Sequence, residues 1–139
     1  ITGEGTPPAP GTPEELPACP VPETAVPAKF VVYIGTNCVG RGDDELGAKL
    51  MRGFLRTWID APVLPWRVIF MNSGVKLTTV DEEAVDAVGM LAQKGVDILS
   101  CGTCLQHFGL EKELKVGKVT NMYEVIESMN AATKVISPD

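Results

Sequence analysis

The first strongly patterned segment of the chain is an unbroken apolar run, Phe30–Ile34, which stops at Gly35. A short continuous run of apolar and β-branched residues is typical of a strand that is buried on both faces. After Asp43 and Asp44, apolar residues recur at helical spacing, and the two carboxylates suit the positive end of a helix dipole. The pattern therefore predicts a long amphipathic helix, with apolar positions at Leu46, Leu50, Phe54, Leu55, Trp58 and Ile59.

The alternation of strand and helix patterns continues to the end of the chain. Residues 66–71 and 96–100 have the composition of a second and a third strand. Between them, Thr79 and Glu82 have the spacing of a capping box at a helix start, and Gly95 is a typical residue to end that helix. We expect the remaining elements to be a short helix at about 104–109, a helix at about 121–132 and a last strand at 134–136.

Strands that alternate with helices predict right-handed crossovers and a mostly parallel sheet. We therefore expect a three-layer α/β fold, with a sheet of about five strands and helices on both of its faces. In such sheets, ligands and reactive groups gather at the carboxyl ends of the strands. With a flavodoxin-like strand order of 2-1-3-4, the loops after the first and third strands are neighbours. That order predicts that Cys38 lies beside Cys101 and Cys104.

Residues 1–28 differ in composition from the rest of the chain. They hold eight of its eleven prolines and almost no bulky apolar residues. Such a segment cannot bury enough surface to offset the entropy of the chain. We expect a Pro-rich linker or tail over residues 1–28 and one α/β domain over residues 29–139.

Composition and charge narrow the class of protein. The formal net charge of −6 and the pI near 4.8 argue against nucleic acid as a partner, because nucleic-acid binding depends on clustered Lys and Arg. No run approaches the roughly 18 apolar residues of a membrane span, so we expect a soluble protein. Four cysteines are too few and too unevenly spaced for a disulfide scaffold, which favours the reducing cytoplasm.

Cys101 and Cys104 form a C-x-x-C motif around Gly102 and Thr103, where the third strand gives way to a helix. The unpaired amides and the dipole at the start of a helix favour a thiolate over a thiol. A thiolate there can hold a sulfane sulfur as a persulfide or form a disulfide with its neighbour. The alternative is that both are small buried core residues. We take Cys101 and Cys104 as catalytic candidates, with Gly102 and Thr103 in support.

Two further features surround this motif. His107 extends it to C-x-x-C-x-x-H and offers, with Cys38, a fourth ligand for zinc, although no second C-x-x-C is present and we expect no metal or other cofactor. The glycine-rich segment 35–44 matches no nucleotide-binding motif. Within it, Arg41 is a candidate for stabilising a nearby anion, and Cys38 for receiving sulfur or trapping Cys101 as a disulfide. The alternative for this segment is a mobile turn in which Cys38 contacts nothing.

Four stretches of the chain carry a resemblance to a known family: Gly42–Gly47, Met71–Val75, Gly95–Leu105 and Val119–Glu124. From about Lys29 to Asp139, the chain resembles the DsrE-like sulfur-relay superfamily, and is most similar to its YedF type, which is sulfurtransferase-like and associated with selenium metabolism. The resemblance implies that a persulfide-forming cysteine follows the third strand, where Cys101 stands, and that Cys104 is an addition of the YedF-like pattern. It leaves open whether the protein is an enzyme.

The resemblance also implies partners. These are sulfur donor and acceptor proteins, with TusA-like proteins as one candidate, and further copies of the chain in a dimer or trimer. A TusA-like domain with a Cys-Pro-x-Pro motif often precedes YedF-type domains. Cys19–Pro22 has that spelling but lacks the surrounding strand and helix, so we interpret it as a linker coincidence or a remnant.

Three hypotheses follow from these observations. The first is a sulfur-relay protein in which Cys101 accepts and passes on sulfane sulfur and Cys104 resolves or shares it. The second is a thiol-disulfide oxidoreductase that uses the same two residues. The third is a noncatalytic assembly or metal-binding module.

Overall fold

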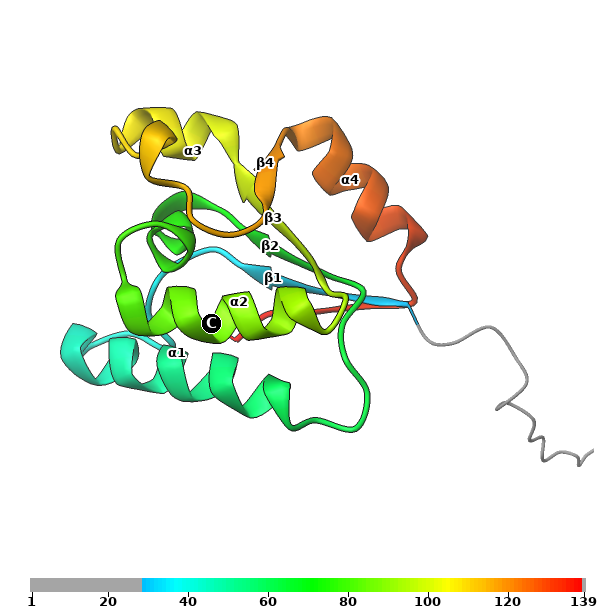
Figure 1. The fold of residues 1–139 in the computed structure, drawn as a ribbon, viewed down its shortest axis with the longest axis horizontal. Coiled ribbons are helices and arrows are strands. Elements are labelled where there is room, and N and C mark those ends of the chain that lie inside the picture. Colours follow the sequence, from blue (N-terminus) through cyan, green and yellow to red (C-terminus); the bar gives the residue numbers. More distant parts are fainter. Residues whose placement is uncertain (1–28, 139) are drawn as a thin grey trace, which may run out of the picture.

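A five-stranded, fully parallel sheet forms the middle layer of the computed structural model, which describes residues 29–138 (Figure 1). The predicted α/β class is confirmed. The expectations for residues 1–28, including the interpretation of Cys19–Pro22, lie outside the described residues. The strands are β1 (Phe30–Ile34), β2 (Arg67–Phe70), β3 (Asp97–Cys101), β4 (Lys118–Thr120) and β5 (Lys134–Ile136).

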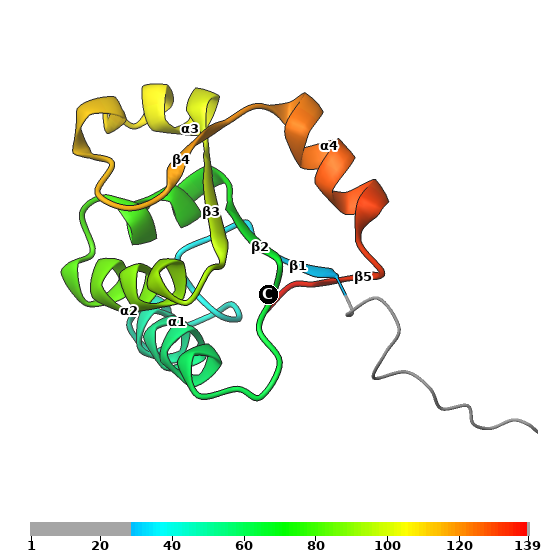
Figure 2. The same cartoon turned by 45° about the vertical axis from the view of Figure 1, so that its right-hand side comes forward.

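Helices cover both faces of the sheet, as expected. Figures 1 and 2 show α1 (Asp44–Ile59) and α2 (Glu82–Gln93) side by side on one face and α4 (Met122–Ala131) on the other. The short α3 (Gly102–His107) follows β3 without an intervening loop. The fold also contains two short 3-10 helices: η2 (Asn72–Thr78) follows β2, and η3 (Glu111–Glu113) follows α3.

The core lies on both faces of the sheet, and α1, α2, α3 and α4 all contribute buried residues to it. In α1 the buried residues are Gly47, Met51 and Leu55, which recur every fourth position and so share one side of the helix. The predicted apolar positions Leu46 and Leu50 are instead 51% and 47% exposed. The buried side of α1 is therefore rotated from the one that the large apolar residues alone indicate, because small Gly47, which packs against the Cys38 side chain, is one of its buried positions.

Aspartates cap the two long helices α1 and α2. Asp43 accepts a hydrogen bond from Leu46 N at 3.0 Å, and Asp81 accepts one from Ala84 N at 3.2 Å. The predicted capping box at Thr79 is wrong. The Thr79 hydroxyl is buried and donates to Val75 O at 2.9 Å, so the helix begins two residues later than the box requires.

The strand order is β4-β3-β2-β1-β5, which contradicts the predicted flavodoxin-like order. Strand β2 lies between β1 and β3, with Ile34 paired to Phe70 and Phe70 paired to Ser100. Two strand spacings amount to about 10 Å, so the loops after β1 and β3 do not adjoin. The loop after β2 separates them.

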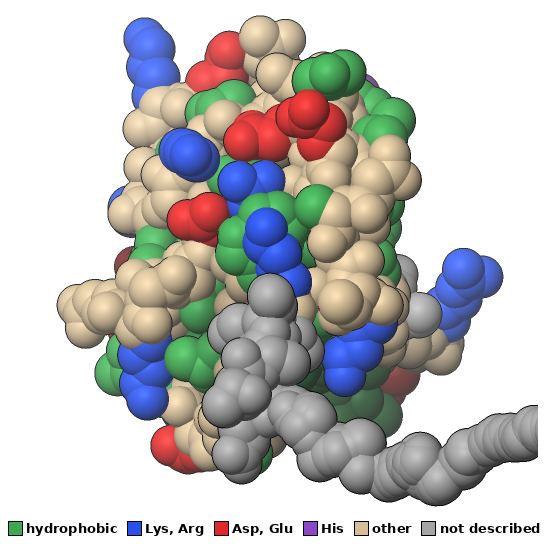
Figure 3. Space-filling model, turned by 90° about the vertical axis from the view of Figure 1, so that its right-hand side faces the viewer, with side chains coloured by type: hydrophobic (Ala, Val, Ile, Leu, Met, Phe, Trp, Pro, Cys, Tyr) green, Lys and Arg blue, Asp and Glu red, His purple; other side chains and the backbone are tan. Residues whose placement is uncertain are grey.

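The edge strand β4 was not predicted as a strand. It has three residues, of which Lys118 and Val119 are exposed, so it lacks the buried apolar run that identifies the central strands. Among residues 29–138, no helix is both long enough and apolar enough to cross a membrane. The face of the molecule in Figure 3 intermixes hydrophobic, basic and acidic side chains.

Candidate functional site

Cys101 is the last residue of β3 and the N-cap residue of α3, which begins at Gly102. Its neighbour across the sheet is Thr120 of β4, and only 6% of Cys101 is exposed. A side chain on Gly102 would place its Cβ 3.0 Å from Val119 Cγ1, which is closer than Cβ atoms usually come. Glycine at this position therefore lets the chain turn from strand to helix while it stays close against β4.

Cys104 is the third residue of α3 and is half-buried. Its Sγ accepts a hydrogen bond from the backbone N–H of Asn72 at 3.1 Å and also interacts with the Cys101 side chain. A cavity of about 320 Å³ opens beside it. We call this cavity the Cys104 pocket; its lining residues are Asn72, Thr103, Cys104, His107 and Phe108.

The protonation of Cys104 differs from the prediction. Burial of the thiol, followed by its hydrogen bond with Cys101, raises the pKa of Cys104 above the ordinary value of 9.0, although the Asn72 N–H acts in the opposite direction. The expectation that the helix start would favour a thiolate is wrong for Cys104. The physical reason is that its sulfur is partly removed from water and lies against a second sulfur.

Asn72 is the residue of this site that the sequence analysis missed. It lies directly after β2 in a left-handed conformation with φ 51°, which is uncommon for a residue other than glycine. Its side-chain Oδ1 accepts a hydrogen bond from Ser73 N at 2.8 Å, and its own N–H is left to bond Cys104. The available signal was an Asn just after a strand, since Asn tolerates this conformation better than most residues.

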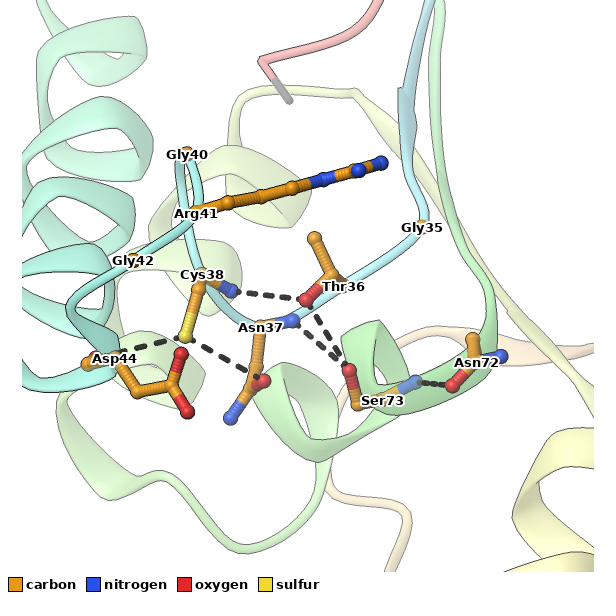
Figure 4. Close-up of a pocket in the computed structure, with 10 residues that line it drawn as sticks. All are labelled: Gly35, Thr36, Asn37, Cys38, Gly40, Arg41, Gly42, Asp44, Asn72 and Ser73. Carbon is orange, nitrogen blue, oxygen red and sulfur yellow. Dashed lines mark hydrogen bonds between the residues drawn. The ribbon is translucent and has the colours of Figure 1, made fainter.

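Cys38 and Arg41 line a second cavity, of about 530 Å³, that lies beyond the carboxyl ends of β1 and β2 (Figure 4). Cys38 is held in place: its thiol donates to Asp44 O at 3.5 Å, and Asn37 Oδ1 lies 3.9 Å away. We call this cavity the loop pocket; its lining residues are Gly35, Thr36, Asn37, Cys38, Gly40, Arg41, Gly42, Asp44, Asn72 and Ser73.

The prediction that Cys38 and Arg41 flank Cys101 in one pocket is wrong, because β2 and its loop intervene. The alternative, in which Cys38 contacts nothing, is also wrong, since its thiol has the partners just described. Asn72 lines both pockets, so it forms the wall between them.

The four residues proposed as zinc ligands do not come together in one site. Within the part of the chain that the structure describes, no group of three or more His, Cys, Asp or Glu residues is placed to hold a metal ion. His107 ends α3, lines the Cys104 pocket and packs edge-on against Phe108, with ring centroids 5.2 Å apart. Cys38, the fourth proposed ligand, lies in the other pocket.

The sequence from residue 48 to residue 138 matches the sequence model of the DsrE/DsrF-like family. The chain belongs to this family. In this DsrE/DsrF-like protein, the parallel sheet carries a cysteine at the end of β3. The family is generally related to sulfur relay, in which its members act with partner proteins. No curated protein sequence matches the chain significantly.

Solved structures share the fold of this DsrE/DsrF-like protein. The ychN protein from E. coli superposes with a TM-score of 0.56 at 14% sequence identity, covering 78% of this chain and 98% of the other. A protein of unknown function from Methanobacterium thermoautotrophicum, MTH1491, gives 0.57 at 20% identity, with 80% and 99% covered. BT1422 from Bacteroides thetaiotaomicron, also of unknown function, gives 0.53 at 16% identity, with 78% and 94% covered.

Proposed function

We propose that this DsrE/DsrF-like protein is a persulfide carrier, in which Cys101 accepts a sulfane sulfur and passes it on while Cys104 shares or resolves it. The observation that carries the proposal is the contact between the two thiols at the carboxyl end of β3, with one thiol buried and the other beside an open pocket. Gly102 and Thr103 form the turn that holds the two thiols together.

The chemistry needs only thiols and a donor persulfide. The Cys101 thiolate attacks the outer sulfur of the donor, the S–S bond of the donor breaks, and the donor leaves as a thiolate. An acceptor thiolate then takes the same sulfur from Cys101 in an identical step. Alternatively, the Cys104 thiolate attacks the inner sulfur of the Cys101 persulfide, which forms a Cys101–Cys104 disulfide and releases hydrosulfide.

Exposure sets the route by which sulfur arrives. Because Cys101 is 6% exposed and Cys104 lines a pocket of about 320 Å³, a donor approaches Cys101 from the Cys104 side. The raised pKa of Cys104 keeps it largely as a thiol near neutral pH, so it does not compete strongly as a nucleophile for the donor sulfur.

The proposal also covers the subfamily, the cargo, the partners, the location and the organisation of the chain. We place the protein in the YedF type, with sulfur or selenium as its cargo and TusA-like proteins among its partners, because the C-x-x-C motif at Cys101 and Cys104 follows that pattern. We place it in the cytoplasm, where free thiols persist. We also keep the two-part organisation, with a Pro-rich segment over residues 1–28 and the domain over 29–139.

A second candidate function is thiol-disulfide exchange by Cys101 and Cys104. The contact between their side chains favours it, because a disulfide requires the two sulfurs to meet. In this case a substrate disulfide is reduced while the two thiols lose two hydrogens and form an internal disulfide. No sulfur atom is then gained.

Intact mass after incubation with a persulfide donor separates the two functions. The carrier gains the mass of one sulfur atom, and the oxidoreductase loses two hydrogens. Cys101→Ser should abolish the gain, whereas Cys104→Ser should retain it and prevent the internal disulfide. Absence of any sulfur gain with protein and small-molecule persulfide donors, together with absence of any selenium gain with a selenium-containing donor, would refute the carrier proposal.

Self-association is part of the proposal as well. Four apolar residues at β4 and the start of α4 are more than half exposed, and a second copy of the chain would remove them from water. Light scattering at micromolar concentration should give the mass of a dimer or trimer; a monomer mass would refute this. The four residues are Val119, Met122, Tyr123 and Ile126.

A further inference from the structure

The loop pocket lies apart from Cys101 and has no part in the proposed sulfur transfer. Its volume of about 530 Å³ falls in the range of about 300–1,000 Å³ that is usual for small-ligand sites. The polar groups on its floor are ordered by one another: Asn37 N donates to Ser73 Oγ at 3.2 Å, and Ser73 Oγ bonds Thr36 Oγ1 at 3.3 Å. The pocket is therefore a preformed polar cavity.

Arg41 supplies an unused positive charge at this pocket. Its side chain extends past Thr36 (Figure 4), and it makes no hydrogen bond or ion pair with another residue in the range 29–138. The glycines on either side, Gly40 and Gly42, have φ angles of 82° and 116°, which residues with a side chain rarely adopt. These two glycines fix the backbone shape that directs Arg41 across the pocket.

Asp44 supplies a negative charge at a different end of the pocket (Figure 4). The N-terminus of α1 does not need this carboxylate, because Asp43 already accepts the capping bond from Leu46 N. Among residues 29–138 the Asp44 carboxylate has no ion-pair partner. A cavity with one free cation and one free anion at separate ends suits a zwitterion, whose charges pair with both.

Cys38 adds a thiol to the wall between these charges. Its Sγ lies next to Asp44, whose backbone oxygen it bonds, and so it is close to the end of the pocket that would take a ligand cation. A wall thiol selects ligands that carry sulfur, because it can exchange with a bound disulfide.

We propose that the loop pocket binds a small amino-acid thiol, in its thiol or disulfide form. Arg41 pairs with the ligand carboxylate, Asp44 pairs with its ammonium group, and the ligand sulfur lies next to Cys38. When the ligand is a disulfide, the deprotonated Cys38 attacks one of its sulfurs and the ligand S–S bond breaks. A new S–S bond forms to Cys38, which is oxidised, and the other half of the ligand is reduced and leaves as a thiolate.

The test compares two disulfides on the full chain. Cystine carries the amino-acid head group, and bis(2-hydroxyethyl) disulfide carries no charge. The rate at which Cys38 forms a mixed disulfide is followed by mass spectrometry of the tryptic peptide 30–41, which becomes 30–49 in Arg41→Ala because that variant lacks the cleavage site. Both peptides are separate from the one that holds Cys101 and Cys104. Because Cys38 alone is read out, a failure of sulfur transfer at Cys101 does not affect this result.

The expected result is that Cys38 reacts faster with cystine than with the neutral disulfide, and that Arg41→Ala lowers the ratio of the two rates about tenfold, as the loss of one charged hydrogen bond implies. Asp44→Asn should lower the ratio as well. Arg56→Ala is the matched control, because it removes one exposed positive charge from the far end of α1 and should leave the ratio unchanged.

Equal rates for the two disulfides, or an equal drop in Arg41→Ala and Arg56→Ala, would overturn the proposal. A parallel titration of Cys38→Ser protein with free cysteine, followed by calorimetry, should show binding that Arg41→Ala weakens. Glutathione disulfide forms the third arm: a slower reaction than with cystine supports a free amino acid as the ligand, and a faster reaction would overturn that assignment.

Discussion

The backbone N–H of Asn72 donates a hydrogen bond to Cys104 Sγ across 3.1 Å, so the loop after β2 contacts the thiol pair that follows β3. This contact depends on the left-handed backbone of Asn72, which has φ 51°. It also places one residue in the walls of both pockets. The conformation of Asn72 should therefore affect both stability and thiol chemistry.

Replacement of Asn72 separates backbone shape from side-chain bonding. Asn72→Ala and Asn72→Gly both lose the bond from Ser73 N to Oδ1, but only glycine adopts a positive φ without strain. We expect the free energy of unfolding of Asn72→Ala to be about 1 kcal/mol lower than that of Asn72→Gly. Urea denaturation measures both, and equal values would show that the left-handed backbone is not required.

Alkylation of Cys104 should depend on pH in a defined direction. Because burial and Cys101 raise its pKa above 9.0, the rate with iodoacetamide should still be rising at a pH where an ordinary exposed thiol has reached its maximum. Cys101→Ala removes one of the two causes, so the profile should move to lower pH. A profile that moves to higher pH, or an unchanged one, would contradict the coupling of the two thiols.

The same shift has a consequence for stability. Folded Cys104 retains its proton to higher pH than unfolded Cys104 does, so its contribution is complete below about 9.0 and is lost as pH rises through the folded value. The free energy of unfolding should therefore fall with rising pH in that window. The midpoint temperatures of thermal denaturation of the parent and of Cys104→Ser should approach each other as the pH rises through this window. A difference between the two midpoints that stays constant with pH would exclude this linkage.

Two glycines of α1 form a matched pair. A Cβ at Gly47 would lie 2.7 Å from Cys38 Cβ, whereas a Cβ at Gly53 would meet nothing within 4 Å. Gly53→Ala should raise the free energy of unfolding by about 0.5–1 kcal/mol through helix propensity. Gly47→Ala should lower it by about 1–3 kcal/mol, because the Cys38 loop must move. Stabilisation of both variants would show that this loop yields without cost.

Local patterns predicted the elements of this fold well, and long-range relationships poorly. The run Phe30–Ile34 indicates a buried strand because five adjacent apolar residues need cover on both faces, and the structure has β1 there. Strand order has no comparable local signal. It depends on which crossovers the whole chain makes, and the flavodoxin-like assumption placed Cys38 next to Cys101 when β2 separates them.

The candidate site was predictable to a similar extent. Placing Cys101 at the end of β3 required only the strand pattern and the Gly102 turn. The protonation of Cys104 was not predictable, since it depends on burial and on a neighbouring sulfur rather than on the helix start. The contribution of Asn72 was not predictable either, because its N–H reaches Cys104 from a strand that sequence spacing does not relate to α3.

Whether Cys101 carries sulfur is best decided by following one sulfur atom through a load and a chase. Cys104→Ser protein is loaded with a persulfide donor, freed of the donor and then mixed with an acceptor thiol, and the peptide that holds Cys101 is fragmented before and after the chase. We expect one added sulfur on Cys101 after loading and its loss to the acceptor during the chase. A Cys101 that gains no sulfur, or that retains it in the presence of acceptor thiol, would contradict the account.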